Sequence, residues 1–420
     1  MKQEKKYFIN IIKNLKWYIF LFLLVFSHQI FYILTPSTHG CGADLPIEFL
    51  YKPAVYNNSF SGKTAITGPD GYSGAYVKVD CDIGGVIIPT GSPTNYILLE
   101  NSNSIERPLH NLTAIPLRYV STFGLRAFNI PIENSYVDIY LSRGKVFQLQ
   151  FYLSWYYAHV LQNLLIIFIT FYLFSKYIKL NFLSVLIFYS IFYIPGLGRD
   201  VLSPDMNLWI PFAIMLSFIT YKEFENEKNR KKIILFTSFS ILLYPIFMIN
   251  FLYIGFLYLN LLLKKNLKLK QIIPEGLFLI TPYFMYRLFL NIQEINFVPA
   301  TMKYMNENIA CKVYCQGVWM FIDANKPNGI LNELARRLKE DFLKGEFNFF
   351  LILFLFFFIL LVISKNKNIL DANFSLLIVS VIIFLIFVGN FKSRYVVYIP
   401  SLFIVHALTD ISKTIKVTSH

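Results

Sequence analysis

Long apolar runs recur along the whole chain and limit the kinds of protein that it can form. The run at 349–363 reads FFLILFLFFFILLVI and approaches the length at which an α-helix crosses a bilayer. Only 15% of the 420 residues are charged, whereas 55% are hydrophobic and 18% are aromatic. A soluble domain of this size rarely exposes so little charge. The sequence therefore predicts an all-α polytopic membrane protein.

Ten segments of this character predict about ten transmembrane helices. They lie at 17–34, 151–174, 181–195, 208–220, 233–247, 249–263, 272–290, 348–364, 374–389 and 396–409. The first segment follows a basic stretch but has no small-residue cleavage site behind it, so we expect a retained helix rather than a signal peptide. Residues 233–263 are consistent with a hairpin at Pro245 and Asn250 or with a single kinked helix.

The distribution of charge predicts the orientation of the chain. If the N-terminus is cytoplasmic, the inner segments carry about twenty cations and about six acids. This difference equals the net charge of the whole chain, which is +14. The pattern places both termini in the cytoplasm and explains the basic chain without nucleic acid. It also favours the hairpin, because a single helix would put the following basic loop outside. We expect an integral protein of a bacterial inner (plasma) membrane.

Two long outer segments separate the predicted helices. The expected order is a cytoplasmic N-terminus (1–16), a first helix (17–34), an outer segment (35–150), helices two to seven (151–290), a second outer segment (291–347), helices eight to ten (348–409) and a cytoplasmic tail (410–420). The larger outer segment is mixed: turn-rich, strand-like pieces precede an amphipathic stretch at 109–128, which we expect as a helix at the interface. The smaller one ends in NELARRLKEDFLKGEF, whose spacing predicts a second interfacial helix.

All four cysteines fall in the predicted outer segments, where disulfides can form. The simplest of the three pairings joins Cys41 to Cys81 and Cys311 to Cys315. Four free thiols are the alternative.

Charged residues at the predicted outer face are the candidates for chemistry. The chain has no GxxxxGKS/T phosphate loop, HExxH, GxSxG or GxGxxG motif, which argues against an ATP-driven pump or a zinc protease. The candidate catalytic acids are Asp70, Asp80 and Asp82, with Asp200 and Asp205 as secondary acids. The candidates for binding a lipid phosphate are Arg107, Arg199, Arg287 and Arg394, because the planar guanidinium donates two hydrogen bonds at once. A carboxylate that deprotonates an acceptor hydroxyl, together with arginines that hold a departing phosphate, predicts glycosyl transfer from a polyprenyl-phosphate sugar.

This layout resembles the GT-C superfamily of integral membrane glycosyltransferases, which carry a key acidic residue in a long first outer loop. The matching segments are Asp80-Cys81-Asp82, similar to a spaced DxD pattern, Asp70 in PDGY, Arg107-Pro108-Leu109, and Arg394-Tyr395 with Pro400 beyond. The resemblance implies a hexosyl- or pentosyltransferase of cell-surface glycan assembly that uses a polyprenyl-phosphate carrier and a sugar acceptor. It implies no certain cofactor, and Asp80 and Asp82 are the candidate ligands of a divalent Mg or Mn ion.

Each candidate residue also has a structural interpretation. Asp70 fits a PDG turn, Asp80 and Asp82 fit a solvated strand edge, and Asp200 and Asp205 fit the start of a helix. The arginines fit side chains that snorkel to the interface, and we expect Glu275 as an interface residue beside Lys270.

Three other functions remain open from the sequence. An O-antigen-type polysaccharide polymerase would use outer arginines such as Arg336 and Arg337. A transporter or flippase would place polar residues near the middle of the membrane. A structural or assembly protein would bind a partner through residues 35–150.

Overall fold

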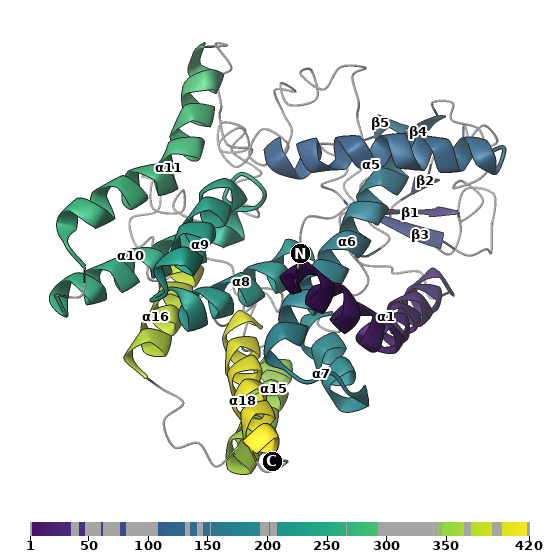
Figure 1. Cartoon of the computed structure of the whole chain (residues 1–420). Coiled ribbons are helices and arrows are strands. Elements are labelled where there is room, and N and C mark those ends of the chain that lie inside the picture. The colour runs from purple at the N-terminus through teal and green to yellow at the C-terminus, as the bar shows by residue number, and fades with distance from the viewer. Residues whose placement is uncertain are drawn as a thin grey trace. The chain divides into compact units, whose positions relative to one another are not determined.

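The computed structural model describes most of the predicted helical segments. It covers residues 2–34, 42–46, 60–61, 76–80, 108–130, 135–140, 146–151, 153–193, 201, 208–265, 267–292, 339, 343, 347–364, 371–388 and 397–417. This part of the chain is mainly helical, with eleven α-helices and five short strands (Figure 1). The chain divides into two compact units, one made of Met1–Ser104 and His110–Leu208, the other of Ile105–Leu109 and Trp209–His420.

The first unit contains helices packed through aromatic side chains. They are α1 (Lys2–Leu34), most of α5 (Pro108–Ala127), α6 (Leu153–Tyr177) and α7 (Phe182–Phe192). The α1 helix begins well before the predicted span at 17–34, because its basic first turns contain good helix formers and neither proline nor glycine. Tyr18 of α1 meets Phe171 of α6 edge to face, with ring centroids 5.0 Å apart, and Phe171 meets Phe188 of α7 at 4.9 Å. Such contacts add to the burial of the rings themselves.

Four of the five strands lie within the predicted outer segment 35–150, and the fifth ends one residue beyond it, at Phe151. β1 (Gly42–Pro46) pairs antiparallel with β3 (Tyr76–Asp80), and Gly42 lies opposite Asp80. β2 (Phe60–Ser61) pairs in parallel with β4 (Ser135–Tyr140), which pairs antiparallel with β5 (Val146–Phe151). Together with α5, these strands confirm the mixed character of the segment and the helix predicted at 109–128.

The second unit is helical throughout its described part. It contains α8 (Trp209–Glu223), α9 (Glu227–Ser240), the 3₁₀ helix η5 (Pro245–Phe247), α10 (Met248–Leu263), α11 (Leu269–Ile292), α15 (Phe347–Ser364), α16 (Ala372–Val388) and α18 (Tyr398–Val417). The first residues of α5 join this unit, where the Leu109 N–H donates to the Leu242 carbonyl at 3.1 Å.

The hairpin predicted between 233 and 263 is confirmed. Tyr244 is extended, with φ −162°, because the residue before a proline is disfavoured in the helical region. The helix therefore ends before Pro245 and a new one follows. Asn250 Nδ2 donates to Thr237 Oγ1 at 2.6 Å, which joins the two arms.

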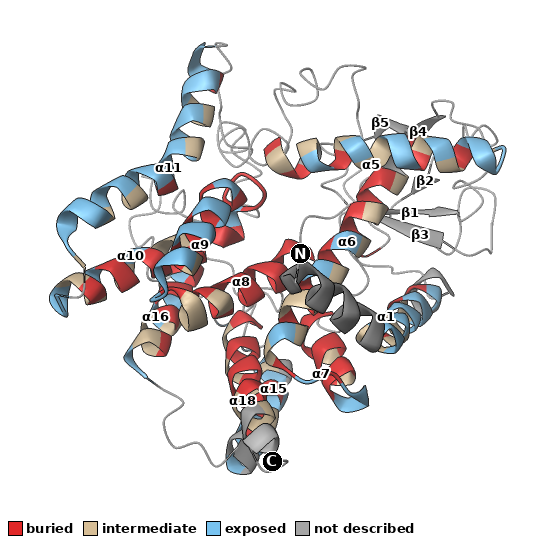
Figure 2. Ribbon diagram, in the orientation of Figure 1, coloured by how far each residue is buried: buried red, intermediate tan, exposed pale blue. Residues whose placement is uncertain are grey.

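Large apolar side chains are exposed on several helices. Figure 2 shows long exposed stretches on α11, where Leu277, Phe284 and Ile292 are each more than half exposed. Two helical segments, Tyr157–Tyr177 and Pro245–Leu263, are long and apolar enough to cross a membrane. These features indicate a helical protein that associates with a membrane. Each of the ten predicted ranges overlaps a helix, although residue 151 belongs to β5 and residues 241–244 lie between α9 and η5. The number of spans stays a prediction.

Candidate functional site

Two of the residues predicted to form the site lie in the described part of the chain. Asp80 is the last residue of β3, opposite Gly42. Arg287 lies near the C-terminal end of α11 and is partly exposed. The others lie outside the described residues: Asp70, Asp82, Arg107, Arg199, Asp200, Asp205, Arg394 and the four cysteines Cys41, Cys81, Cys311 and Cys315. The same is true of Arg336 and Arg337. Their roles stay predictions.

Within the first unit, α5 crosses the N-terminal end of α6 (Figure 1). Ala114 of α5 and Ala158 of α6 are fully buried, with Ile115 and Leu117 packed against them. Small residues allow two helices to approach closely. The α5 helix begins at Pro108, a residue suited to a first helical turn because it lacks the N–H that would have no partner there.

Buried polar side chains fix this junction between α5 and α6. Gln162 Nε2 donates to the His110 carbonyl and to Thr113 Oγ1, both at 2.7 Å. Gln162 Oε1 lies 2.9 Å from His159 Nδ1, and the His110 and His159 rings stack with centroids 5.2 Å apart. The two helices are thus joined by paired polar groups as well as by apolar contact.

The outer surface of α5 is aromatic. Tyr119 is 74% exposed, Phe123 is 76% exposed, and Val120 between them is also exposed. Arg126 lies in the last turn. An amphipathic helix with aromatic and apolar residues on one face is typical of a segment that lies at a membrane surface.

A second polar group, in the second unit, joins α8, α16 and α18. Tyr221 Oη donates to Asp371 Oδ2 at 2.6 Å and lies 2.9 Å from His406 Nε2. His406 Nδ1 is 3.2 Å from Asp410 Oδ2. Burial raises the pKa of Tyr221, and the hydrogen bond to Asp371 raises it further. The phenol therefore keeps its proton and remains a hydrogen-bond donor.

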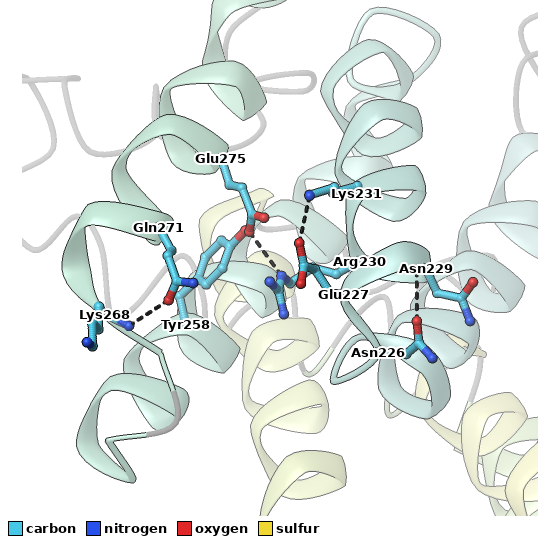
Figure 3. Close-up of polar contacts among 9 residues, drawn as sticks. All are labelled: Asn226, Glu227, Asn229, Arg230, Lys231, Tyr258, Lys268, Gln271 and Glu275. Atoms are coloured by element: carbon cyan, nitrogen blue, oxygen red, sulfur yellow. Dashed lines mark hydrogen bonds and ion pairs between the residues drawn. The ribbon is translucent and has the colours of Figure 1, made fainter.

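A third polar group holds α9, α10 and α11 together (Figure 3). Arg230 Nε donates to Glu275 Oε2 at 3.0 Å, and Tyr258 Oη donates to the same oxygen at 2.5 Å. The Arg230 and Glu275 side chains are only 6% and 16% exposed. The sequence did not predict that Glu275 pairs with Arg230 of α9, and its expected position at the interface beside Lys270 stays a prediction.

Exposed contacts surround this buried pair. Lys231 Nζ and Glu227 Oε1 form an ion pair of 2.7 Å one turn apart on α9. The hydrogen bond from Lys231 lowers the pKa of Glu227. The Asn226 side chain caps α9 by accepting the Asn229 N–H at 3.3 Å (Figure 3).

The polar groups around Tyr221 and around Arg230 connect helix ends that the charge pattern predicts on the cytoplasmic side of the membrane. These ends are the C-termini of α8 and α10, the N-termini of α9, α11 and α16, and the last turns of α18. Asn260 Nδ2 also donates to Asn373 Oδ1 at 2.8 Å, and Asn373 Nδ2 donates to Glu225 Oε1 at 3.3 Å. The contacts are therefore consistent with the prediction that successive helices of this unit cross the membrane in alternating directions.

Sequence reasoning missed Arg230, Tyr221 and His406 as members of polar groups. For His406 a signal was available, since a histidine inside the apolar run YIPSLFIVHALTDI is unusual in a membrane helix. Arg230 stands within a basic run, EKNRKK, and nothing in that run distinguishes the one cation that becomes buried.

No cluster of three or more His, Cys, Asp or Glu suited to a metal ion occurs within the described ranges. The proposed Mg or Mn ligand Asp82 lies outside them.

Comparison of the chain with protein-family models, with curated proteins and with solved structures finds no match in any of the three. The resemblance to GT-C enzymes therefore rests on the sequence pattern alone.

Proposed function

We propose that the protein is an integral membrane glycosyltransferase that moves a sugar from a polyprenyl-phosphate carrier to an acceptor at the outer membrane face. The observation that carries the proposal is α5. This helix exposes an aromatic face, is anchored to an apolar helix, and belongs to the same segment as Asp70, Asp80 and Asp82. In the chain, Arg107 directly precedes its first residue.

The proposed reaction assigns a role to each group. The isoprenoid tail of the carrier lies against the apolar surface of α5 and the neighbouring helices. One of the three aspartates accepts the proton of the acceptor hydroxyl as its oxygen bonds to the anomeric carbon. The bond from that carbon to the phosphate oxygen breaks, and the phosphate keeps the electron pair. Arg107, Arg199, Arg287 and Arg394 are the candidates that stabilise the departing phosphate.

The proposal includes the finer topology. The chain crosses a bacterial inner membrane about ten times, with both termini in the cytoplasm and residues 35–150 and 291–347 outside. The cation excess of the inner segments supports this orientation. The pairing of predicted inner helix ends through Tyr221–Asp371 and Asn260–Asn373 is consistent with it.

Sugar transfer by the purified protein tests the proposal. The full-length chain is reconstituted in liposomes with radiolabelled polyprenyl-phosphate hexoses and pentoses and the extracted surface glycan of the host. Transfer should occur with one of these donors. Asp70→Asn, Asp80→Asn or Asp82→Asn should lower its rate by on the order of 100-fold or more, because a general base is lost.

Asp44→Asn is the matched control, since Asp44 is a carboxylate of the same segment, placed on β1. It should leave the rate unchanged. Transfer that survives all three candidate substitutions would show that none of these aspartates is the general base. Absence of transfer from every donor would overturn the proposed transferase activity.

A further inference from the structure

We propose that the Arg230 group binds the phosphate of an anionic phospholipid in the inner leaflet. The site lies between the N-terminal turns of α9 and α11, where Arg230, Tyr258 and Glu275 meet (Figure 3). The inference uses the proposed membrane orientation but is independent of glycosyl transfer.

Arg230 has hydrogen-bond donors to spare. A guanidinium carries five N–H donors, and Nε uses one of them on Glu275. Among the described residues, neither Nη group of Arg230 donates a hydrogen bond to the protein. The side chain is only 6% exposed, yet neither Nη atom is among the buried side-chain atoms that lack a partner. The end of the guanidinium fork therefore stays open to an acceptor from outside the protein. A phosphate supplies several oxygens to the planar fork at once.

The charge around Arg230 favours an anion. Residues 227–275 contain eight Lys and Arg but only two Glu. Both carboxylates are already paired, Glu227 with Lys231 and Glu275 with Arg230. The other cations of this stretch are Lys228, Lys232, Lys264, Lys265, Lys268 and Lys270. The N-terminal end of α9 adds the positive end of its helix dipole.

The apolar surface beside the pair identifies the anion as a lipid. Phe278 lies one turn after Glu275 on α11 and is exposed, as is its neighbour Leu277. Acyl chains that lie along these side chains would cover them, whereas a free phosphate ion would leave them bare. The inner leaflet is also the one that attracts basic segments through its anionic lipids.

Lipid binding to the delipidated full-length protein tests this site. Native mass spectrometry and thermal unfolding would compare phosphatidylglycerol, phosphatidylcholine and inorganic phosphate as probes. Phosphatidylglycerol should bind at least about tenfold more tightly than phosphatidylcholine, and inorganic phosphate should not displace it. Equal binding of the two lipids overturns the proposal, and displacement by inorganic phosphate would indicate a free-anion site instead.

Two charge-balanced variants separate the site from general surface charge. R230Q/E275Q removes the buried pair without leaving a lone charge, and E227Q/K231Q removes the exposed pair on the same helix. The first should abolish the lipid preference and the second should keep it. If R230Q/E275Q does not fold, R230K serves, because it keeps the charge and loses the fork. A preference that survives loss of the fork contradicts the role of Arg230.

Discussion

At the scale of single residues, the polar side chains of the second unit are connected rather than scattered. Glu275 accepts hydrogen bonds from both Arg230 and Tyr258, and Tyr221 links Asp371 to His406. A buried ion pair stabilises little compared with an apolar replacement, but loss of one partner leaves a costly lone charge.

Arg230→Gln should therefore lower the free energy of unfolding by about 3–5 kcal/mol, because it leaves the Glu275 carboxylate uncompensated. R230Q/E275Q should recover most of this loss, since both charges are gone. Denaturant titration of the detergent-solubilised protein measures the difference. Lys231→Gln, at the exposed neighbouring pair, is the control and should leave the midpoint unchanged. Equal losses in the single and double variants would show that Arg230 acts alone.

Tyr221 should make stability depend on alkaline pH. Its folded-state pKa is raised above the ordinary value of 10.0, first by burial and then by Asp371. The stability that it contributes is therefore complete below pH 10 and is lost as the pH rises above that value. The melting temperature of the wild type should fall more steeply above pH 10 than that of Tyr221→Phe. Parallel pH profiles would mean that the Tyr221 phenol ionises as readily in the folded as in the unfolded chain.

At the scale of elements, the sequence predicted where helices lie better than what they touch. Apolar runs located all ten helical ranges, and loop charges chose the hairpin at Pro245 over a kinked helix. Helix α5 followed from its amphipathic pattern. The partner of Glu275 was not predictable, because it depends on how α9 packs along α11, a choice between residues 45 positions apart. The candidate outer site could be predicted only as a set of residue types, without their geometry.

The exposed face of α5 should lie at the membrane surface. Phe123→Trp should fluoresce at shorter wavelength in liposomes than in the unfolded chain, and lipids brominated near the headgroup should quench it more than lipids brominated deep in the acyl chain. The wild-type signal of the four native tryptophans is subtracted as background. Strong quenching by aqueous iodide instead would place α5 in water.

The pairing of β1 with β3 predicts a disulfide. Gly42 lies opposite Asp80 in this antiparallel pair, and in the chain Cys41 precedes Gly42 while Cys81 follows Asp80. Non-reducing peptide mapping of the purified protein should therefore recover Cys41 joined to Cys81, because cross-strand neighbours lie within reach of a disulfide. A Cys41 peptide joined to Cys311 or Cys315 would contradict the register.

At the scale of the whole molecule, both proposals depend on the same orientation. The aromatic helix α5 and the three aspartates must face outward for the carrier and acceptor to meet, and the Arg230 group must face inward for the anionic lipids. The predicted inner segments carry an excess of cations, and the helix ends beside them contact one another in the second unit. Both observations support placing these helix ends together on the cytoplasmic side of the membrane.

Cysteine accessibility in right-side-out membrane vesicles tests this orientation most directly. The four native cysteines are first replaced by serine, and the melting profile of this variant shows whether it folds. In that background, Ser61→Cys reports on the outer segment and Lys228→Cys reports on the inner end of α9. A membrane-impermeant maleimide should label Ser61→Cys in intact vesicles and should label Lys228→Cys only after the vesicles are opened. Labelling of both positions in intact vesicles, or the reverse order, would contradict the orientation and both proposed sites with it.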